Sequence, residues 1–132
     1  MTTSPATTSP PRTLGAVTGL HVIADLYGCA AAPVMTDAAF LEHTCLQYVR
    51  EAGLFDVGRL FHAFPGDGGV TGTVVLAESH LSLHTWPEHG YVSLDVFVCN
   101  YTADNTAKAR ALADRLMDLF APGERRVQEV FR

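Results

Sequence analysis

The sequence predicts an α+β fold: a two-layer sandwich in which an antiparallel sheet carries two helices on one face. Three observations support this class. The segments follow one another as strand, helix, several strands, helix and strand. The central strands alternate polar and apolar residues, as strands do when one face of a sheet is buried and the other is open. The 132 residues are 48% hydrophobic and 17% charged, which suits one globular domain with a single core.

The bulk properties restrict the partners and the location. Residues 1–14 are rich in Thr, Ser and Pro, so we expect a disordered tail before a single domain over residues 15–132. The net charge of −5 argues against nucleic acid or a membrane as partner, because both attract basic surfaces. Three cysteines without a CxxC pair suit a reducing compartment. With no visible secretory signal and no apolar run of membrane-spanning length, a cytoplasmic protein is expected.

The first half of the domain is expected to hold a strand, a helix and a second strand. Residues 17–26 are rich in β-branched and apolar side chains, which favours a strand. Asp37 precedes and Gly53 follows a segment whose apolar residues recur every three or four positions, so a helix is predicted between them. Residues 54–64 are expected to be extended. The Pro- and Gly-rich residues 64–69 form a predicted loop.

The second half is expected to hold three strands, a helix and a final strand. The predicted segments are strands over residues 70–77 and 80–86, a turn over residues 87–90, a strand over residues 91–99, a helix from Thr102 or Asp104 to Pro122, and a strand over residues 127–131. Strict alternation in the second of these strands divides its side chains between two faces. One face would carry His80, Ser82, His84 and Trp86, and the other Leu81, Leu83 and Thr85.

The four-residue turn predicts which residues face each other across the hairpin. If Trp86 pairs with Tyr91, the residue numbers of every facing pair add up to 177. Glu78 then lies opposite Cys99. The Cys99 thiol would then lie beside the Glu78–Ser79 peptide bond, unless a bulge shifts the register by one residue. By default, however, a cysteine in an apolar strand is only a small buried hydrophobe.

His84 does not fit the same local arrangement. It lies five positions past Ser79, which is about 16 Å along an extended strand, and it has the opposite parity. Either His84 is unrelated to Ser79, or it acts on the Ser79 of a neighbouring subunit, which predicts a two-fold dimer with shared sites. The trio His80, His84 and His89 invites a metal site. We assign no metal, because the spacing follows a strand and a turn and the carboxylates form no known ligand set.

One long motif resembles a known family. The run AESHLSLHTWPEHGY over residues 77–91, followed by DVFVC over residues 95–99, resembles the bacterial and archaeal S-adenosylmethionine decarboxylase proenzymes. The resemblance extends at lower density over residues 19–130, including Phe61-His62-x-Phe64 and Gly69-Val70-Thr71-Gly72. Chance agreement over so long and irregular a motif is remote.

The resemblance implies that the chain cuts itself. The hydroxyl of Ser79 would attack the carbonyl of Glu78 and convert the amide into an ester. Elimination across Ser79 would then give a dehydroalanine, which hydrolyses to a pyruvoyl group at the new N-terminus. The products would be a β chain, residues 1–78, and an α chain, residues 79–132.

The resemblance also implies which residues assist cleavage and which take part in decarboxylation. His84 would be the acid or base of processing, and Thr71 stands where the family commonly has a helping serine. The pyruvoyl group would form a Schiff base with the substrate and withdraw electrons as carbon dioxide leaves, without pyridoxal phosphate or a metal. Cys99 would be the proton donor to the carbanion. Short members of the family form homodimers, in which the histidine and the glutamate that matches Glu88 reach in from the opposite subunit.

The resemblance also assigns two residues to substrate binding. Phe64 matches the aromatic residue that stacks on adenine, and Glu88 the carboxylate that binds ribose hydroxyls, which implies S-adenosylmethionine and a place in spermidine biosynthesis. Residues 65–69 depart from the family pattern, since this loop is one residue longer, lacks an aromatic residue and contains Asp67. Asp67 would hold the distal cation of arginine or ornithine, on which some members act, or it simply favours a Gly-rich turn.

Three functions therefore remain. The first is S-adenosylmethionine decarboxylase, and the second is a pyruvoyl-dependent arginine or ornithine decarboxylase on the same scaffold. The third is an unprocessed binding or regulatory homologue. The presence of Glu78, Ser79, His84 and Cys99 together argues against the third.

Overall fold

The computed structural model describes residues 5–7, 17–101 and 103–132. In chain order its elements are β1 (Ala6–Thr7), β2 (Gly19–Tyr27), α1 (Ala32–Met35), α2 (Ala38–Glu51), β3 (Asp56–Ala63), β4 (Val70–Leu76), β5 (His80–Trp86), the 3₁₀ helix η1 (Pro87–His89), β6 (Tyr91–Cys99), α3 (Thr106–Leu119) and β7 (Glu124–Phe131).

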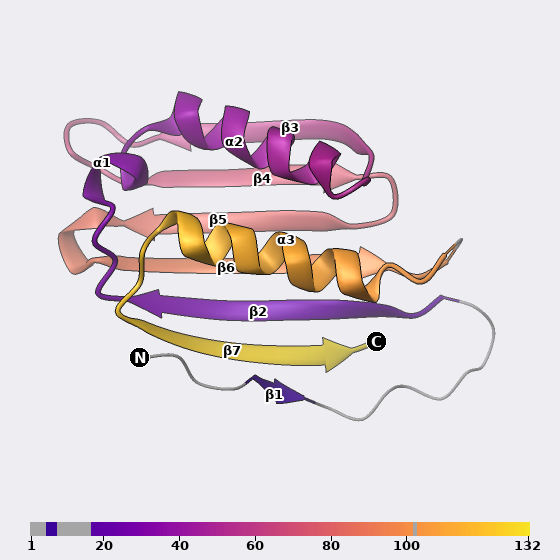
Figure 1. The fold of residues 1–132 in the computed structure, drawn as a ribbon. Helices are drawn as coiled ribbons and strands as arrows, with labels where there is room; N and C mark the ends of the chain where they lie inside the picture. The colour runs from indigo at the N-terminus through magenta and orange to yellow at the C-terminus, as the bar shows by residue number, and fades with distance from the viewer. Residues whose placement is uncertain (1–4, 8–16, 102) are drawn as a thin grey trace.

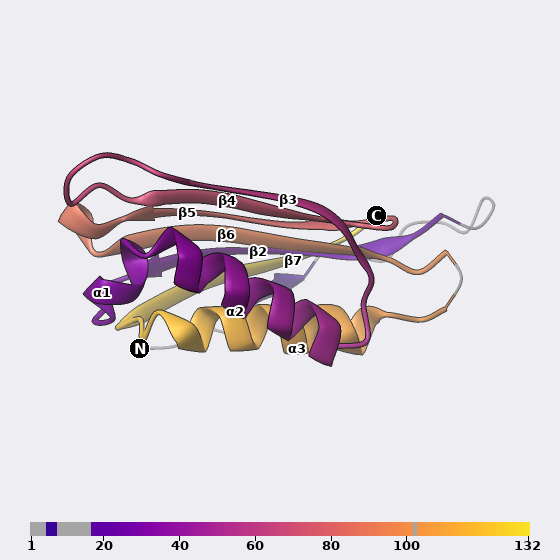
Figure 2. The same ribbon diagram turned by 90° about the horizontal axis from the view of Figure 1, so that it is seen from above.

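The strands form one sheet in the order β1-β7-β2-β6-β5-β4-β3. Neighbouring strands are antiparallel, apart from β1 and β7, which run parallel. Helices α2 and α3 lie next to each other on one face of this sheet, α2 over β3 and β4 and α3 over β2 and β6 (Figures 1 and 2). The predicted sandwich of an antiparallel sheet and two long helices on one face is thereby confirmed.

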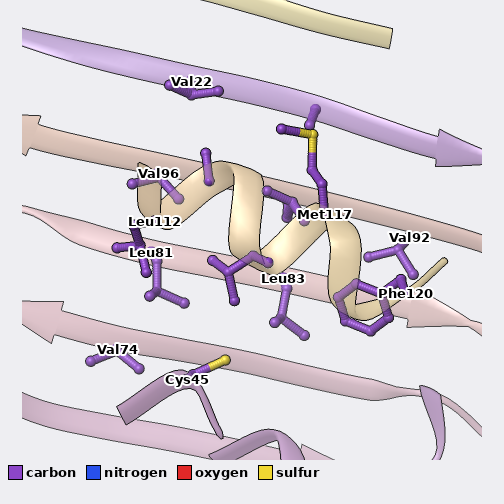
Figure 3. Packing of buried hydrophobic residues seen from close by; sticks show 14 of the residues in the cluster. Val22, Cys45, Val74, Leu81, Leu83, Val92, Val96, Leu112, Met117 and Phe120 are labelled. Atoms are coloured by element: carbon purple, nitrogen blue, oxygen red, sulfur yellow. The ribbon is translucent and has the colours of Figure 1, made fainter. Parts of the chain in front are cut away.

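The core lies between the two helices and the sheet. Alternation in β5 turns Leu81 and Leu83 toward the helices, where both are fully buried. Leu112 and Met117 of α3, and Phe120 directly after it, pack onto this apolar surface, as Figure 3 shows. Burying such side chains contributes roughly 1.5–3 kcal/mol each, so the alternating pattern fixes which face of each strand meets the helices.

The structure differs from the sequence expectation at the ends of several elements. Two short helices, α1 and η1, were not predicted as helices; each has a proline in its first turn, where the fixed φ of proline suits a helix start. Strand β7 begins at Glu124, three residues earlier than predicted, because the ladder with β2 continues as far as Tyr27. The expected helix start after Asp37 is confirmed, since the Asp37 carboxylate accepts a hydrogen bond from the Phe40 N–H at 3.0 Å.

The N-terminal segment is described only in part. Within the predicted tail over residues 1–14, Ala6–Thr7 forms a two-residue strand beside Gln128 and Glu129 of β7. The predictions for residues 1–4 and 8–14, and for Thr102 as a helix cap, lie outside the described residues. None of the helices in the described part of the chain is both long and apolar enough to cross a membrane.

The face of the sheet opposite the helices, which we call the open face, carries no helix among the described residues (Figure 2). It presents the polar and aromatic half of each alternating strand. Leu60, Val75 and Trp86 are its exposed large apolar side chains, with 67%, 45% and 37% of their surfaces accessible. An apolar and aromatic surface of this kind is typical of a face that packs against another molecule.

Candidate active site

The Glu78–Ser79 bond lies at the end of the β4–β5 hairpin. The Leu76 N–H donates to the Ser79 carbonyl at 2.9 Å and closes a connection of two residues, Ala77 and Glu78. The Ala77 N–H donates to the carbonyl of Phe55 at 3.0 Å, which holds the turn against the end of β3. Glu78 is exposed and Ser79 is half-buried. The bond is therefore reachable from solvent although it is held on both sides by the sheet.

Ser79 is hydrogen-bonded to the backbone of Cys99, the last residue of β6. The Cys99 backbone N–H donates a hydrogen bond of 2.8 Å to Ser79 Oγ. The pairs of β5 and β6 run from Trp86 with Tyr91 to His80 with Phe97, so the predicted register, in which paired positions sum to 177, is confirmed. The paired residues end at His80 and Phe97, and just beyond them the Cys99 N–H reaches Ser79 Oγ at the Glu78–Ser79 junction.

Ser79 and Cys99 line a pocket at this end of the sheet, which we call the serine pocket. Its volume is about 260 Å³, and its wall comprises Gly53, Leu54, Phe55, Leu76, Ala77, Glu78, Ser79, Val98, Cys99, Ala103, Asn105 and Lys108. The wall thus combines the β4–β5 turn with residues next to the C-terminus of α2 and the N-terminus of α3.

Sequence reasoning missed two polar residues of the serine pocket. Asn105 Nδ2 donates to the Cys99 carbonyl at 2.9 Å, and Lys108 extends from the first turn of α3. Neither residue belongs to the motif over residues 77–91 and 95–99 that predicts cleavage at the Glu78–Ser79 bond. Their positions depend on how the segment after β6 turns back into α3, and no local pattern in the sequence shows that path.

A second group of predicted residues lies at the other end of β4 and β5. Thr71 pairs with His84 across these two strands, and Thr71 Oγ1 is 3.0 Å from His84 Nδ1, a hydrogen-bond distance. The ring of His84 also packs beside Trp86, with centroids 5.9 Å apart. Thr71 and His84 line a pocket of about 350 Å³, which we call the histidine pocket. The rest of its wall comprises Phe64, Gly68, Gly69, Thr85, Trp86 and Glu88.

The loop after β3 shapes the wall of the histidine pocket. The Phe64 N–H donates to the Gly69 carbonyl at 3.0 Å, which closes the loop, and the Phe64 ring is half exposed. A Cβ at Gly69 would lie 1.9 Å from the Thr85 carbonyl oxygen, so only glycine permits this approach of the loop to β5. Asp67 is exposed at the tip and is not part of the pocket wall.

The predicted residues therefore fall into two separate groups within one chain. The serine pocket holds Glu78, Ser79 and Cys99, whereas the histidine pocket holds Phe64, Thr71, His84 and Glu88. The two walls share no residue, and the length of β5 lies between them. The structure thus agrees with the expectation that His84 does not reach the Ser79 of its own chain.

The three cysteines differ in their surroundings. Burial raises the pKa of the Cys45 thiol to about 12 and also raises the pKa of the Cys29 thiol. Cys45 belongs to the fully buried core, and neither Cys29 nor Cys45 lines the serine pocket. Cys99 is the cysteine placed next to the junction.

Comparison with known proteins identifies the family. The family model of S-adenosylmethionine decarboxylase matches residues 20–132. The S-adenosylmethionine decarboxylase proenzyme of Carboxydothermus hydrogenoformans is 46% identical over 86 residues, 65% of this chain and 66% of the relative. That of Syntrophomonas wolfei is 38% identical over 114 residues, 86% of each chain. The matched part thus spans just under two thirds of the first of these relatives.

A solved structure agrees with the sequence matches. The crystal structure of adenosylmethionine decarboxylase from Aquifex aeolicus superposes with a TM-score of 0.72 at 30% identity, covering 89% of this chain and 91% of that one. Fold and sequence thus agree. This chain belongs to the S-adenosylmethionine decarboxylase family.

Proposed function

We propose that this protein is an S-adenosylmethionine decarboxylase proenzyme that cuts itself between Glu78 and Ser79. The observation that carries the proposal is the position of the Ser79 hydroxyl. Its oxygen accepts the Cys99 N–H at 2.8 Å, at the end of a tight hairpin and in the wall of a pocket. A serine held in this way next to an exposed peptide bond is suited to attack the preceding carbonyl.

The contacts of Ser79 suit the first step of cleavage. In that step a bond forms between Ser79 Oγ and the carbonyl carbon of Glu78, and the bond from that carbon to the Ser79 nitrogen breaks. The hydroxyl proton has to leave to a base, and the nitrogen has to gain a proton. Because the Cys99 N–H occupies one lone pair of Oγ, it fixes the side chain and leaves the hydroxyl proton free for the base.

The fold is suited to survive the cut. Cleavage in a two-residue hairpin connection breaks no strand, and β4 and β5 keep their ladder. The two products would also interlock: β2 of residues 1–78 lies between β6 and β7 of residues 79–132. The two chains would therefore stay together through the sheet and the shared core.

The surroundings of Ser79 also fit the pyruvoyl group that the family implies. Ser79 would become the first residue of the new chain, half-buried in the serine pocket with Cys99 in the same wall. The group supplies a carbonyl that binds the substrate amine and draws electrons away as carbon dioxide leaves. Cys99, in the same wall, would be the proton donor to the substrate carbon.

The two separate pockets support a homodimer with shared active sites. Thr71 and His84 contribute a hydroxyl and an imidazole but lie about 16 Å from Ser79 along β5. In a two-fold dimer, the histidine pocket of one subunit would complete the serine pocket of the other. The serine pocket, at about 260 Å³, is smaller than most small-molecule sites, and the histidine pocket, at about 350 Å³, is at the lower end of their range. A joint site therefore suits a nucleoside substrate better.

The histidine pocket favours S-adenosylmethionine over an amino acid as substrate. Phe64 offers a half-exposed aromatic ring for stacking on adenine, and Glu88 offers a carboxylate for ribose hydroxyls. Asp67, which would favour arginine or ornithine, stands outside the pocket wall. Decarboxylation of S-adenosylmethionine would supply the aminopropyl donor for spermidine synthesis.

Intact mass and carbon dioxide release test the proposal. Purified protein should give two species that match residues 1–78 and 79–132, and Ser79→Ala should give one uncut chain. Release of carbon dioxide should be fastest with S-adenosylmethionine, compared with arginine and ornithine. A single full-length species that releases no carbon dioxide, or cleavage of Ser79→Ala, would refute the assignment. Faster carbon dioxide release from arginine or ornithine would show that the substrate is an amino acid instead.

A further inference from the structure

Three side chains from neighbouring strands converge on the open face of the sheet. His21 of β2 and His80 of β5 both point their Nε2 atoms at the same carboxylate oxygen of Asp95 on β6, at 2.8 Å and 3.3 Å. The register explains this meeting, because His21 and His80 both pair with Phe97, from opposite sides of β6. The Phe97 ring packs against both imidazoles, with centroids 5.7 and 5.9 Å away, which restricts their rotation.

The three donor atoms have the chemistry and the spacing of a metal site. All three lie within 4.8 Å of one another. Two imidazole nitrogens and one carboxylate oxygen are a ligand set that zinc and related dications take in proteins. With bonds of about 2.0–2.1 Å in a tetrahedral arrangement, neighbouring ligand atoms lie about 3.3 Å apart. The observed separations from the Asp95 oxygen are close to that value, so small side-chain rotations suffice.

The site is partly exposed in the single chain and lies outside the serine pocket. The side chains of His21, Asp95 and His80 are 20%, 30% and 41% exposed, which leaves room for water in the remaining position. His21 and Asp95 line a cavity of about 240 Å³ on the open face, and His84 lines the same cavity. None of His21, Asp95 and His80 lines the serine pocket, although His80 directly follows Ser79 in the chain.

The sequence alone suggested a different set of histidines. His80, His84 and His89 are close along the chain, but His84 pairs with Thr71 and His89 is exposed in η1. The residue that joins His80 is His21, which comes from a strand on the other side of β6. The spatial cluster therefore has a ligand set that the spacing along the chain did not show.

We propose that His21, His80 and Asp95 bind one transition-metal dication of the zinc class. The alternative is that the carboxylate serves only to accept hydrogen bonds from the two imidazoles. The two accounts differ in the role of Nε2, because an imidazole that donates its Nε2–H to Asp95 has no lone pair there for an ion, whereas a metal ligand presents a bare Nε2. Metal binding would therefore require both rings to carry their proton on Nδ1, whereas the hydrogen-bonded trio alone binds no ion.

Cobalt titration tests the site without reference to enzyme activity. The full chain is prepared without a histidine tag, and Co²⁺ is added under anaerobic conditions while visible absorption is recorded. We expect one Co²⁺ per chain, displaced by Zn²⁺. His21→Gln and Asp95→Asn should each weaken binding by more than about 100-fold, since even residues that only orient metal ligands are worth 10–100-fold. The exposed His43 of α2 provides the matched control, and His43→Gln should bind as the unaltered chain does.

Two outcomes would overturn the proposal. Absence of stoichiometric Co²⁺ binding by the unaltered chain would show that the trio is held by hydrogen bonds alone, whatever the variants do. Binding that persists in His21→Gln and Asp95→Asn would place the ion elsewhere. Circular dichroism of each variant shows that a loss of binding occurs in folded protein. Because uncut and cut chains contain the same three residues, failure of the proposed self-cleavage would leave the binding result unchanged.

Discussion

Thr71 Oγ1 and His84 Nδ1 lie 3.0 Å apart and face each other across β4 and β5. A hydrogen bond at Nδ1 fixes the orientation of an imidazole ring and leaves Nε2 to exchange a proton with another group. The pair is thus a histidine oriented by a neighbouring hydroxyl, placed in the wall of the histidine pocket beside Trp86. In the proposed dimer this oriented ring would act at the junction of the other subunit.

Removing the Thr71 hydroxyl should slow self-cleavage. Thr71→Val keeps the shape of the side chain but loses the partner of His84 Nδ1, and a hydrogen bond worth about 1 kcal/mol corresponds to a slowing of roughly five- to tenfold. Thr71→Ser keeps the hydroxyl and should cleave at nearly the original rate. Intact mass during cell-free synthesis measures the rates. Equal rates for the Val and Ser variants would show that the hydroxyl has no role in cleavage.

Replacing Cys99 should separate cleavage from turnover. The contact that holds Ser79 comes from the backbone N–H of Cys99, which Cys99→Ala retains. We expect this variant to cut itself and yet to lose about 10²–10⁴-fold in kcat, because the proton donor to the substrate carbon is absent. Product analysis should then show an aldehyde by-product. Cys45→Ala is the comparison, since the buried Cys45 lies outside the pocket and its loss should change stability rather than kcat.

The faces of β5 and its register with β6 were predictable from the sequence. Strict alternation from His80 to Trp86 and a four-residue turn leave one pairing that buries Leu81 and Leu83. The junction of Ser79 with Cys99 follows from that pairing. These features are local, because they depend on residues of one hairpin.

Features that depend on strand order were not predictable in the same way. His21 meets Asp95 across 74 positions of the chain, only because β2 inserts between β6 and β7. Alternation predicts the face of each of these residues but not its neighbouring strand. Asn105 is a similar case, since its contact with Cys99 depends on the path of the segment before α3. The sequence predicted the chemistry at the hairpin, whereas contacts between distant strands required the structure.

The acidic residues of α3 predict a pH dependence of stability. Burial and then the charge of Asp118 raise the pKa of the Asp114 carboxyl. A carboxyl with a higher pKa in the folded chain binds more protons when folded. Stability therefore falls as pH rises from the ordinary aspartate pKa through the folded one. Asp114→Asn should raise the free energy of unfolding near pH 7, by less than about 1 kcal/mol because the group is largely exposed and screened.

Urea unfolding at two pH values checks this sign. The gain from Asp114→Asn should disappear well below the ordinary aspartate pKa of about 3.9, where the carboxyl is protonated in both states. Asp104 is the matched control, because hydrogen bonds from Thr106 lower the pKa of its carboxyl. Asp104→Asn should therefore reduce stability near pH 7. The same sign of change in both variants would contradict the electrostatic explanation.

Complementation between two inactive variants should reveal the shared site. A dimer of Ser79→Ala chains contains no reactive serine, and a dimer of His84→Ala chains contains no processing histidine. In a mixed dimer, the intact Ser79 of the His84→Ala chain would meet the intact His84 of the Ser79→Ala chain. One of the two sites then has all its groups, so half of the sites in mixed dimers should be competent.

Co-expression with distinguishable tags measures this outcome. Purification through both tags isolates mixed dimers, and intact mass should show that the His84→Ala chain is cut while the Ser79→Ala chain stays whole. Decarboxylase activity per mixed dimer should reach about half that of the unaltered dimer, since one of two equivalent sites is restored. If His84 acted on its own chain, the mixed dimer would contain no site with both groups. Cleavage of the His84→Ala chain would then be no faster in mixed dimers than alone, and the separation of the two pockets would need another explanation.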